Sequence, residues 1–109
     1  MKRGNFLFVE KVDNQYVVSM TPELQDDIGT VGFVEFLSED DVKKDEPIVS
    51  LEASKTVMDI LCPVSGRIVE RNEAAEGQPN LFNSAKPEEN WIVKLEQVDE
   101  ADFEQLEEA

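Results

Sequence analysis

The residues that decide how this chain folds are 49–66, with the sequence VSLEASKTVMDILCPVSG. Two runs rich in apolar and β-branched residues, 48–53 and 57–61, flank a few small and polar residues around Lys55. This pattern predicts a tight β-hairpin, because small and polar residues let the chain turn while the flanking runs pair. We therefore expect the side chain of Lys55 to project into solvent from the hairpin tip.

Further strand signals lie on both sides of this hairpin, separated by polar turn segments rich in Ser, Asp, Glu, Gly and Pro. Many short strands with frequent turns are typical of a β-sandwich or a β-barrel, so the chain is predicted to be mainly β. The additional strands are expected over residues 30–37, 66–71 and 91–95, and the turns over 38–41, 45–47 and 63–66.

The N-terminal part predicts a second hairpin followed by a short helix. Residues 6–12 and 16–20 are β-rich runs joined by a polar turn. Thr21 is a typical N-cap residue, Pro22 suits the first helical position, and Gly29 is placed to end the helix. One or two helical turns are therefore expected over residues 22–28.

A weak internal repeat relates two parts of the chain. Residues 48–52, IVSLE, recur as IVKLE at 92–96, and GFVE at 32–35 resembles GRIVE at 66–70. The two halves are either related by a pseudo-two-fold axis or alike by chance, since strand composition alone produces such short matches.

Length and charge restrict the classes of function. A chain of 109 residues has room for one domain. Its net charge of −15 repels phosphate backbones and anionic lipid, so neither nucleic acid nor membrane is an expected partner. The acidic field either favours basic protein surfaces or simply keeps a small domain soluble.

Missing residue types argue against catalysis. The chain has no histidine, and it lacks phosphate-binding glycine motifs, a nucleophile elbow and a C-x-x-C pair. No apolar run approaches a membrane span, and no signal-peptide pattern follows the N-terminus. The single cysteine, Cys62, cannot form an internal disulfide and is expected to pack in the core. We therefore expect a cytoplasmic protein that is not an enzyme.

The C-terminal segment, residues 99–109, is acidic and has Phe103 and Leu106 at helical spacing. Asp99 is suited to cap a helix that begins near Ala101. We expect a short helical tail here, added to a domain that spans residues 1–98.

The context of Lys55 suggests more than an exposed surface lysine. Together, the motifs around it make the chain resemble the H protein of the glycine cleavage system, and most closely its short bacterial H-like paralogues. The resemblance implies a lipoyl carrier domain with lipoate amide-linked to Lys55, and a flattened barrel-sandwich of two antiparallel sheets with short helices. It is carried by DIG at 27–29, GFVE at 32–35, LEASK at 51–55, PVSGRIVERNE at 63–73 and WIVK at 91–94.

The same resemblance implies partners and two further site residues. A lipoate ligase would attach the group, with Glu52 as a candidate for ligase recognition. H-like paralogues are associated with a sirtuin-class ADP-ribosyltransferase and a macrodomain hydrolase, and Asp27 is a candidate for ADP-ribosylation. Related biotinyl domains carry Met on both sides of their lysine, whereas Lys55 lies between Ser54 and Thr56, so lipoyl fits better.

Departures from the family pattern favour one role over another. Loop glycines of the family are replaced near Asp40 and Asp45, and its Gly-Glu-Gly-Trp segment reads EENW at 88–91. Asp and Asn tolerate left-handed turns, so the fold should survive these changes. We expect a lipoate-relay or stress-response ADP-ribosylation role. The alternatives are a genuine H protein that works with glycine cleavage enzymes, and an unmodified acidic adaptor.

Overall fold

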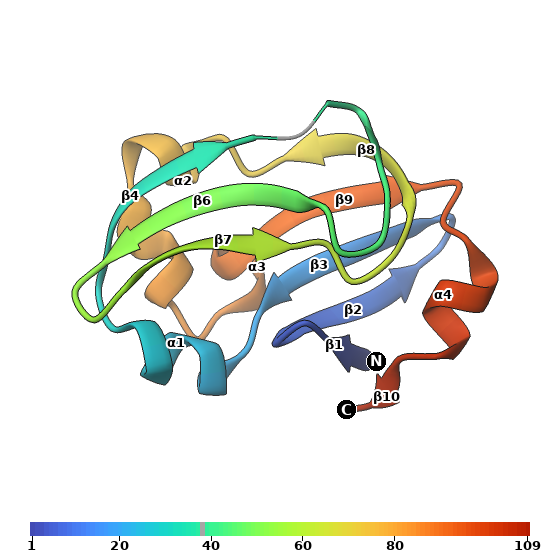
Figure 1. Ribbon diagram of the computed structural model, residues 1–109, viewed down its shortest axis with the longest axis horizontal. Coiled ribbons are helices and arrows are strands. Elements are labelled where there is room, and N and C mark those ends of the chain that lie inside the picture. The colour runs from blue at the N-terminus through green and yellow to red at the C-terminus, as the bar shows by residue number, and fades with distance from the viewer. Residues whose placement is uncertain (38) are drawn as a thin grey trace.

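Strands dominate the part of the chain that the computed structural model describes, residues 1–37 and 39–109 (Figure 1). They form two antiparallel sheets, one of seven strands in the order β10-β1-β2-β3-β9-β8-β5 and one of three in the order β4-β6-β7. The predicted mainly β sandwich with short helices is confirmed. The elements are β1 (Lys2–Gly4), β2 (Leu7–Val12), β3 (Gln15–Met20), α1 (Pro22–Ile28), β4 (Val31–Phe36), β5 (Asp41–Val42), β6 (Pro47–Ala53), β7 (Val57–Leu61), β8 (Gly66–Arg71), α2 (Ala74–Gly77), η1 (Pro79–Asn83), α3 (Pro87–Asn90), β9 (Trp91–Glu96), α4 (Glu100–Glu104) and β10 (Glu107–Glu108).

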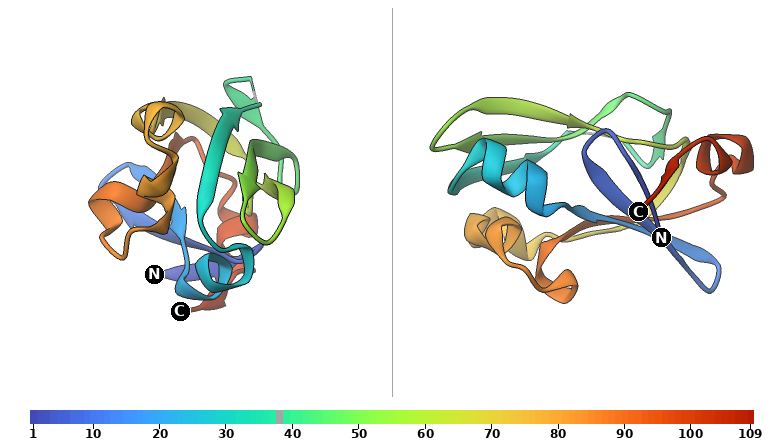
Figure 2. Two further views of the ribbon diagram at one scale, coloured as in Figure 1. Left: turned by 90° about the vertical axis from the view of Figure 1, so that its left-hand side faces the viewer. Right: turned by 90° about the horizontal axis from the view of Figure 1, so that it is seen from below.

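The hydrophobic core lies between the two sheets, which face each other in the end-on view (Figure 2, left). In β3, Tyr16, Val18 and Met20 are buried while the residues between them are partly exposed, as expected for a strand with one face on the core. Burying side chains of this size stabilises the fold by roughly 1.5–3 kcal/mol each. The largest fully buried side chains are Phe82, Leu7, Met20, Ile28, Ile48, Leu51, Ile60, Ile92 and Leu95.

The internal repeat corresponds to two antiparallel strand pairs. The pair β4 and β6 has Val34 opposite Leu51, and the pair β8 and β9 has Ile68 opposite Leu95. These four residues hold equivalent positions in the repeat, so the two pairs have the same register at this point, whereas their register shifts fall at different places. Each pair contributes to a different sheet, and all four side chains are buried.

The first hairpin differs from the prediction at its start. A further strand, β1, precedes β2, and Phe6 lies in the turn between them instead of in the strand. Asn5 and Phe6 both have positive φ, 50° and 68°, as in a two-residue type I′ turn. A short first strand was not expected because it pairs with β2 and with β10, which is distant in sequence.

The predicted helix over 22–28 is confirmed as α1. The hydroxyl of Thr21 accepts a hydrogen bond from the Leu24 amide at 3.2 Å and donates one to the Phe6 carbonyl at 2.6 Å. Pro22 is the first helical residue, and Gly29 follows the last one with φ of 78°. The two buried side chains of the helix, Leu24 and Ile28, are four residues apart and face the core.

Three short helices between β8 and β9 had no counterpart in the sequence prediction. They are α2, η1 and α3, and they cover one end of the sandwich (Figure 2). Phe82 of η1 is fully buried and anchors this segment in the core. The amide group of Asn72 donates to the carbonyls of Glu89 and Trp91, which ties the start of the segment to its end.

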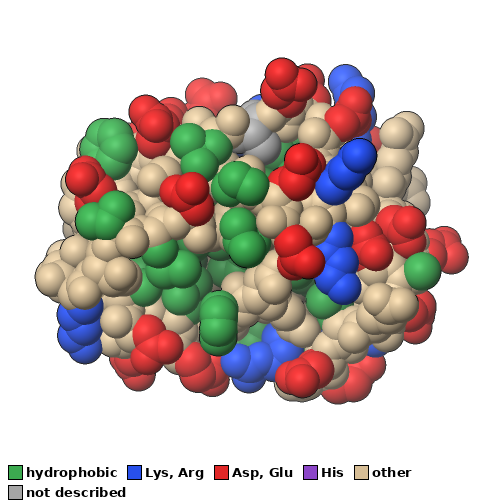
Figure 3. Space-filling view, viewed as in Figure 1, with side chains coloured by type: hydrophobic (Ala, Val, Ile, Leu, Met, Phe, Trp, Pro, Cys, Tyr) green, Lys and Arg blue, Asp and Glu red, His purple; other side chains and the backbone are tan. Residues whose placement is uncertain are grey.

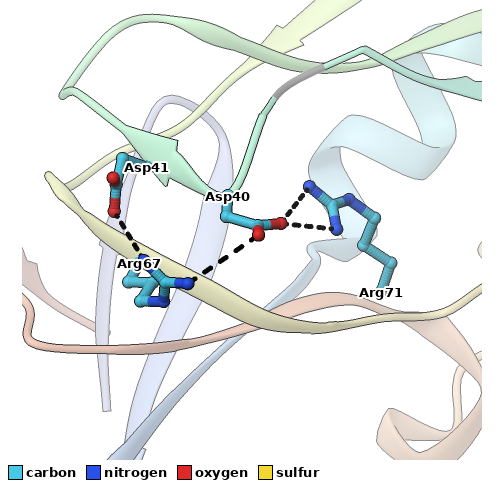
Figure 4. A network of polar contacts seen from close by, with 4 residues as sticks. All are labelled: Asp40, Asp41, Arg67 and Arg71. Atoms are coloured by element: carbon cyan, nitrogen blue, oxygen red, sulfur yellow. Dashed lines mark hydrogen bonds and ion pairs between the residues drawn. The ribbon is translucent and has the colours of Figure 1, made fainter.

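The region predicted as a turn over 38–41 contains the start of a strand. Ser38 lies outside the described residues, and Asp41 already belongs to β5, which pairs with β8. Asp40 lies 3.4 Å from Arg71 and 3.9 Å from Arg67, and Asp41 lies 3.5 Å from Arg67 (Figure 4). These charges hold the edge strand β5 against β8.

The C-terminal segment forms a short helix and a short strand. Helix α4 follows Asp99, whose carboxylate accepts from the Asp102 amide at 3.1 Å. Phe103 packs edge-on against Tyr16, with ring centroids 5.0 Å apart. After the helix, β10 pairs with β1, so the segment lies against the sandwich.

Candidate cofactor-attachment site

Lys55 lies at the tip of the hairpin formed by β6 and β7. The amide of Ala53 donates to the carbonyl of Thr56 at 2.9 Å, which closes the turn. Glu52 and Val57 form the last pair of the ladder before it. The side chain of Lys55 is exposed, as the sequence predicts, but it lies back against α1 instead of projecting freely into solvent.

The end of α1 holds the turn in place. The amide of Lys55 donates to the carbonyl of Ile28 at 3.0 Å, and the amide of Ser54 donates to the carbonyl of Thr30 at 2.9 Å. In return, the hydroxyl of Ser54 accepts from the amide of Thr30 at 2.9 Å. Three hydrogen bonds thus fix the backbone from which the Lys55 side chain starts, beside the last turn of α1 (Figure 1).

Gly29 allows this close approach. Its φ of 78° and ψ of −152° belong to a region that is open almost only to glycine. A Cβ at this position would overlap the hydroxyl oxygen of Ser54 and lie 3.2 Å from Cγ of Lys55. Gly29 is therefore needed both for the backbone conformation and for the space that the turn occupies.

The amine of Lys55 lies against the end of the helix. Its Nζ donates to the carbonyl oxygen of Asp26 at 2.9 Å. A helix C-terminus carries partial negative charge, which attracts an ammonium group. Acylation would remove the charge of this amine and leave one N–H, so the contact favours the unmodified lysine.

An open hollow of about 430 Å³ lies beside Lys55. Its lining includes the polar side chains of Gln25, Asn80, Asn83 and Ser84. The amine at its edge is accessible from solvent, and the fixed turn sets where an attached chain would begin. The exposed amine on this fixed turn is a group to which an acyl chain can be joined through an amide bond.

Two residues that support the site were not found by sequence reasoning. Asn83 accepts from the amide of Val31 and donates to the carbonyl of Gly29, both at 2.8 Å. Gln25 donates to the carbonyls of Phe82 and Ser84 at 2.9 and 2.8 Å. Both residues join α1 and its following loop to η1, more than 50 positions away, and no local pattern predicts such contacts.

Comparison with known proteins decides the family. The model of the glycine cleavage H-protein family matches residues 2–109. The chain belongs to the glycine cleavage H-protein family. It is similar to the glycine cleavage system H-like protein of Staphylococcus aureus, with 62% identity over 99% of this chain and 98% of that protein. It is also similar to the glycine cleavage system H protein of Listeria monocytogenes, with 42% identity over 91% of this chain and 80% of that protein.

The fold is shared with a solved structure. The crystal structure of a glycine cleavage system H protein from Mycobacterium marinum matches with a TM-score of 0.80 over 99% of this chain and 88% of that chain, at 23% identity. Proteins of the H-protein family are lipoyl carriers, not enzymes, and carry lipoate on a lysine. The sequence identity to the H-like protein, 62%, is higher than the identity to the Listeria H protein, 42%.

The other two predicted site residues of this H-protein family member lie on either side of the turn. Glu52 is exposed on β6, opposite Phe33 of β4 and Val57 of β7. Asp27 is exposed in α1, between the two residues whose carbonyls accept hydrogen bonds from Lys55. Their roles in recognition and modification stay predictions.

Cys62 is fully buried, as expected of a packing residue. Burial raises the pKa of its thiol from 9.0 to about 11. At neutral pH the thiol is therefore protonated and inert. The described residues contain no cluster of three or more His, Cys, Asp or Glu suited to a metal. Nor do they include a helix long and apolar enough to cross a membrane.

Proposed function

We propose that this protein is a lipoyl carrier with lipoate amide-linked to Lys55, and that it is a substrate of modifying enzymes without catalytic activity of its own. The observation that carries the proposal is the exposed Lys55 at a hairpin tip that is fixed by one hydrogen bond to Ile28, the last residue of α1, and two to Thr30 just after it. We further propose a cytoplasmic location, where the lone Cys62 stays reduced.

The chain's own residues supply position. A lipoyl group supplies a redox-active dithiolane at the end of a long flexible arm. The Lys55 turn sets the origin of that arm, and a rigid origin raises the local concentration of the cargo near a docked partner. Glu52, exposed next to the turn, is proposed to contact a basic side chain of the lipoate ligase.

Intact mass spectrometry tests attachment. Incubation of the wild-type protein with lipoate, ATP and a lipoate ligase should add one lipoyl group, and Lys55→Ala should gain no mass. Lys86→Ala, which removes another exposed lysine, is the matched control and should be modified like wild type. The proposal fails if Lys55→Ala gains the same mass as wild type.

The system that this carrier serves is proposed to be a lipoate relay or a stress-response pathway that uses ADP-ribosylation. Support comes from the 62% identity to an H-like protein and from the replaced loop glycines. Asp45, near which one of these glycines is replaced, has φ of 70°, so an aspartate takes the left-handed conformation in this loop.

The competing function is the carrier role in glycine cleavage, which the 42% identity to an H protein favours. Reconstitution of the lipoylated protein with the glycine cleavage enzymes distinguishes the two. Turnover equal to that of a glycine cleavage H protein would refute a role limited to the relay.

Asp27 is proposed as the ADP-ribosylated residue, because its exposed carboxylate lies in the last turn of α1 beside Lys55. Incubation with NAD⁺ and a sirtuin-class ADP-ribosyltransferase should modify the wild type, and a macrodomain hydrolase should reverse the reaction. Asp27→Asn should stay unmodified, whereas Asp13→Asn, in a distant exposed turn, should react normally. Equal modification of Asp27→Asn would exclude this site.

An unmodified acidic adaptor is the remaining alternative. It predicts that partners bind Lys55→Arg as well as wild type, because arginine keeps the charge but cannot be lipoylated. If the protein is a carrier, a partner that depends on the lipoyl group should not bind the Lys55→Arg variant. A pull-down with both proteins decides between them.

A further inference from the structure

Phe6 adopts a backbone conformation that its residue type disfavours. It is the second residue of the β1–β2 turn, with φ of 68°, where glycine is usual and a bulky side chain is strained. The carbonyl of Phe6 accepts from the hydroxyl of Thr21 at 2.6 Å, and the amide group of Asn5 donates to Asp45 at 2.9 Å. These contacts hold the turn in this conformation.

Burial does not explain why a phenylalanine occupies this position. The Phe6 side chain is 63% exposed, so most of its apolar surface faces water. A strained backbone that displays an aromatic ring is the arrangement expected of a recognition residue, since aromatic side chains dominate the energetic centres of protein interfaces.

An apolar hollow of about 120 Å³ lies directly beside Phe6. Apolar side chains from α1 and β7 form most of its wall, and Figure 3 shows hydrophobic side chains gathered between these two elements. We call this area the Phe6 surface. Its apolar residues are Phe6 and Leu61, which are exposed, Met58, which is partly exposed, and Leu24 and Ile60, which are buried at its floor.

Helix α1 connects the Phe6 surface to Lys55. The N-cap of the helix, Thr21, bonds to Phe6, while the carbonyls of Asp26 and Ile28 near its other end accept from Lys55. A helix of seven residues is about 10 Å long at ~1.5 Å per residue. The backbone of Phe6 and the amine of Lys55 thus contact opposite ends of one short helix.

Negatively charged side chains lie around the Phe6 surface and α1. Asp26 and Asp27 are exposed on α1, and Asp59 is exposed on β7 at the rim of the hollow. Glu23, also on α1, is paired with Arg3 at 2.8 Å. A protein that docks here would therefore need an apolar socket for Phe6 with basic side chains beside it.

We infer that the Phe6 surface is a docking site for the enzyme that acylates Lys55, which would receive Phe6 in an apolar socket and set basic residues against α1 and β7. The inference rests on the proposed function. Docking at the Phe6 end of α1 would orient an enzyme active site toward the hairpin tip at the other end of the helix without covering it.

Phe6→Gly separates recognition from folding. Glycine accepts the positive φ without strain, so this variant should fold at least as well as wild type while it lacks the ring. Assayed with lipoate, ATP and a lipoate ligase, Phe6→Gly should show a KM for the carrier raised about tenfold, the size of effect typical of a central interface residue, with kcat unchanged. Phe6→Asn, which also tolerates positive φ, should behave the same way.

Val12→Ser is the matched control. It removes an exposed apolar side chain from the opposite end of the adjoining strand and should leave KM unchanged. Wild-type kinetics for Phe6→Gly, confirmed as folded by thermal unfolding, would overturn the inference and leave the proposed function intact. A wild-type protein that gains no lipoyl mass would overturn both.

Discussion

At the level of single residues, Gly29 and the Lys55 turn constrain each other. We expect Gly29→Ala to destabilise the protein by more than about 1 kcal/mol, because the backbone has positive φ and the new methyl group would overlap Ser54. Urea unfolding measures the loss. Gly77→Ala is the control, since a Cβ there meets nothing within 4 Å and should be neutral or stabilising. Equal stability of the two variants would contradict the role given to Gly29.

Cys62 predicts a dependence of stability on pH. Its folded pKa, about 11, is above the ordinary value of 9.0, so the unfolded state releases its proton first as pH rises. The contribution of this thiol to the free energy of unfolding is therefore fully present below pH 9. Between about pH 9 and 11 the free energy of unfolding falls by roughly 2–3 kcal/mol.

The variant Cys62→Ala isolates this effect. Its stability deficit relative to wild type should shrink as pH rises through that window, as urea unfolding at each pH would measure. Val64→Ala, a nearby fully buried position without a titratable side chain, should keep a constant deficit. A constant deficit for Cys62→Ala would show that the thiol does not titrate differently on folding.

Single residues differ in how far the sequence reveals them. The place of Lys55 at a hairpin tip was predicted because its turn and its flanking strands are local, and its role as the attachment residue stays a prediction. Asn83 and Gln25 were not found, because their role depends on backbone groups brought close only by the fold. Phe6 was predicted to lie in a strand because it is apolar. Its positive φ in the structure shows that it lies in a turn.

At the level of elements, the strands with a buried face were predictable and the short connecting elements were not. Runs rich in β-branched and apolar residues predicted β3, β6 and β9, and the structure shows that alternate residues of β3 are buried. The helices α2, η1 and α3 have four or five residues each, too few to show a helical period. The strands β1, β5 and β10 have two or three residues and exist through pairing with distant partners.

Helix η1 supports the end of α1 through Asn83. We expect Asn83→Ala to cost about 1–3 kcal/mol in the free energy of unfolding, because the Val31 amide and the Gly29 carbonyl would lose their partner. Hydrogen exchange at the Val31 amide should also become faster. Asn80→Ala, at an exposed position of the same helix, should change stability by less than about 0.5 kcal/mol. An unchanged exchange rate at the Val31 amide would argue against this stabilising contact between Asn83 and the segment after α1.

At the level of the whole molecule, the net charge of −15 should speed association with a basic partner. We expect kcat/KM for lipoylation by a lipoate ligase to fall about tenfold as salt rises from about 0.05 to 0.5 M, because screening shortens the range of attraction. Activation of free lipoate by the same ligase without carrier is the control and should change little. Salt-independent kinetics would mean that the acidic surface serves solubility alone.

The pairing of β1 with β10 also has a consequence for protein engineering. The amide of Ala109 donates to the carbonyl of Met1 at 3.2 Å, so a linker of a few residues could join the two ends into a ring. New ends could then open at the exposed turn after β2, around Asp13 and Asn14. Such a circular permutant would keep the Lys55 hairpin tip intact, and it would offer an attachment point for a surface or a reporter at a different corner of the molecule.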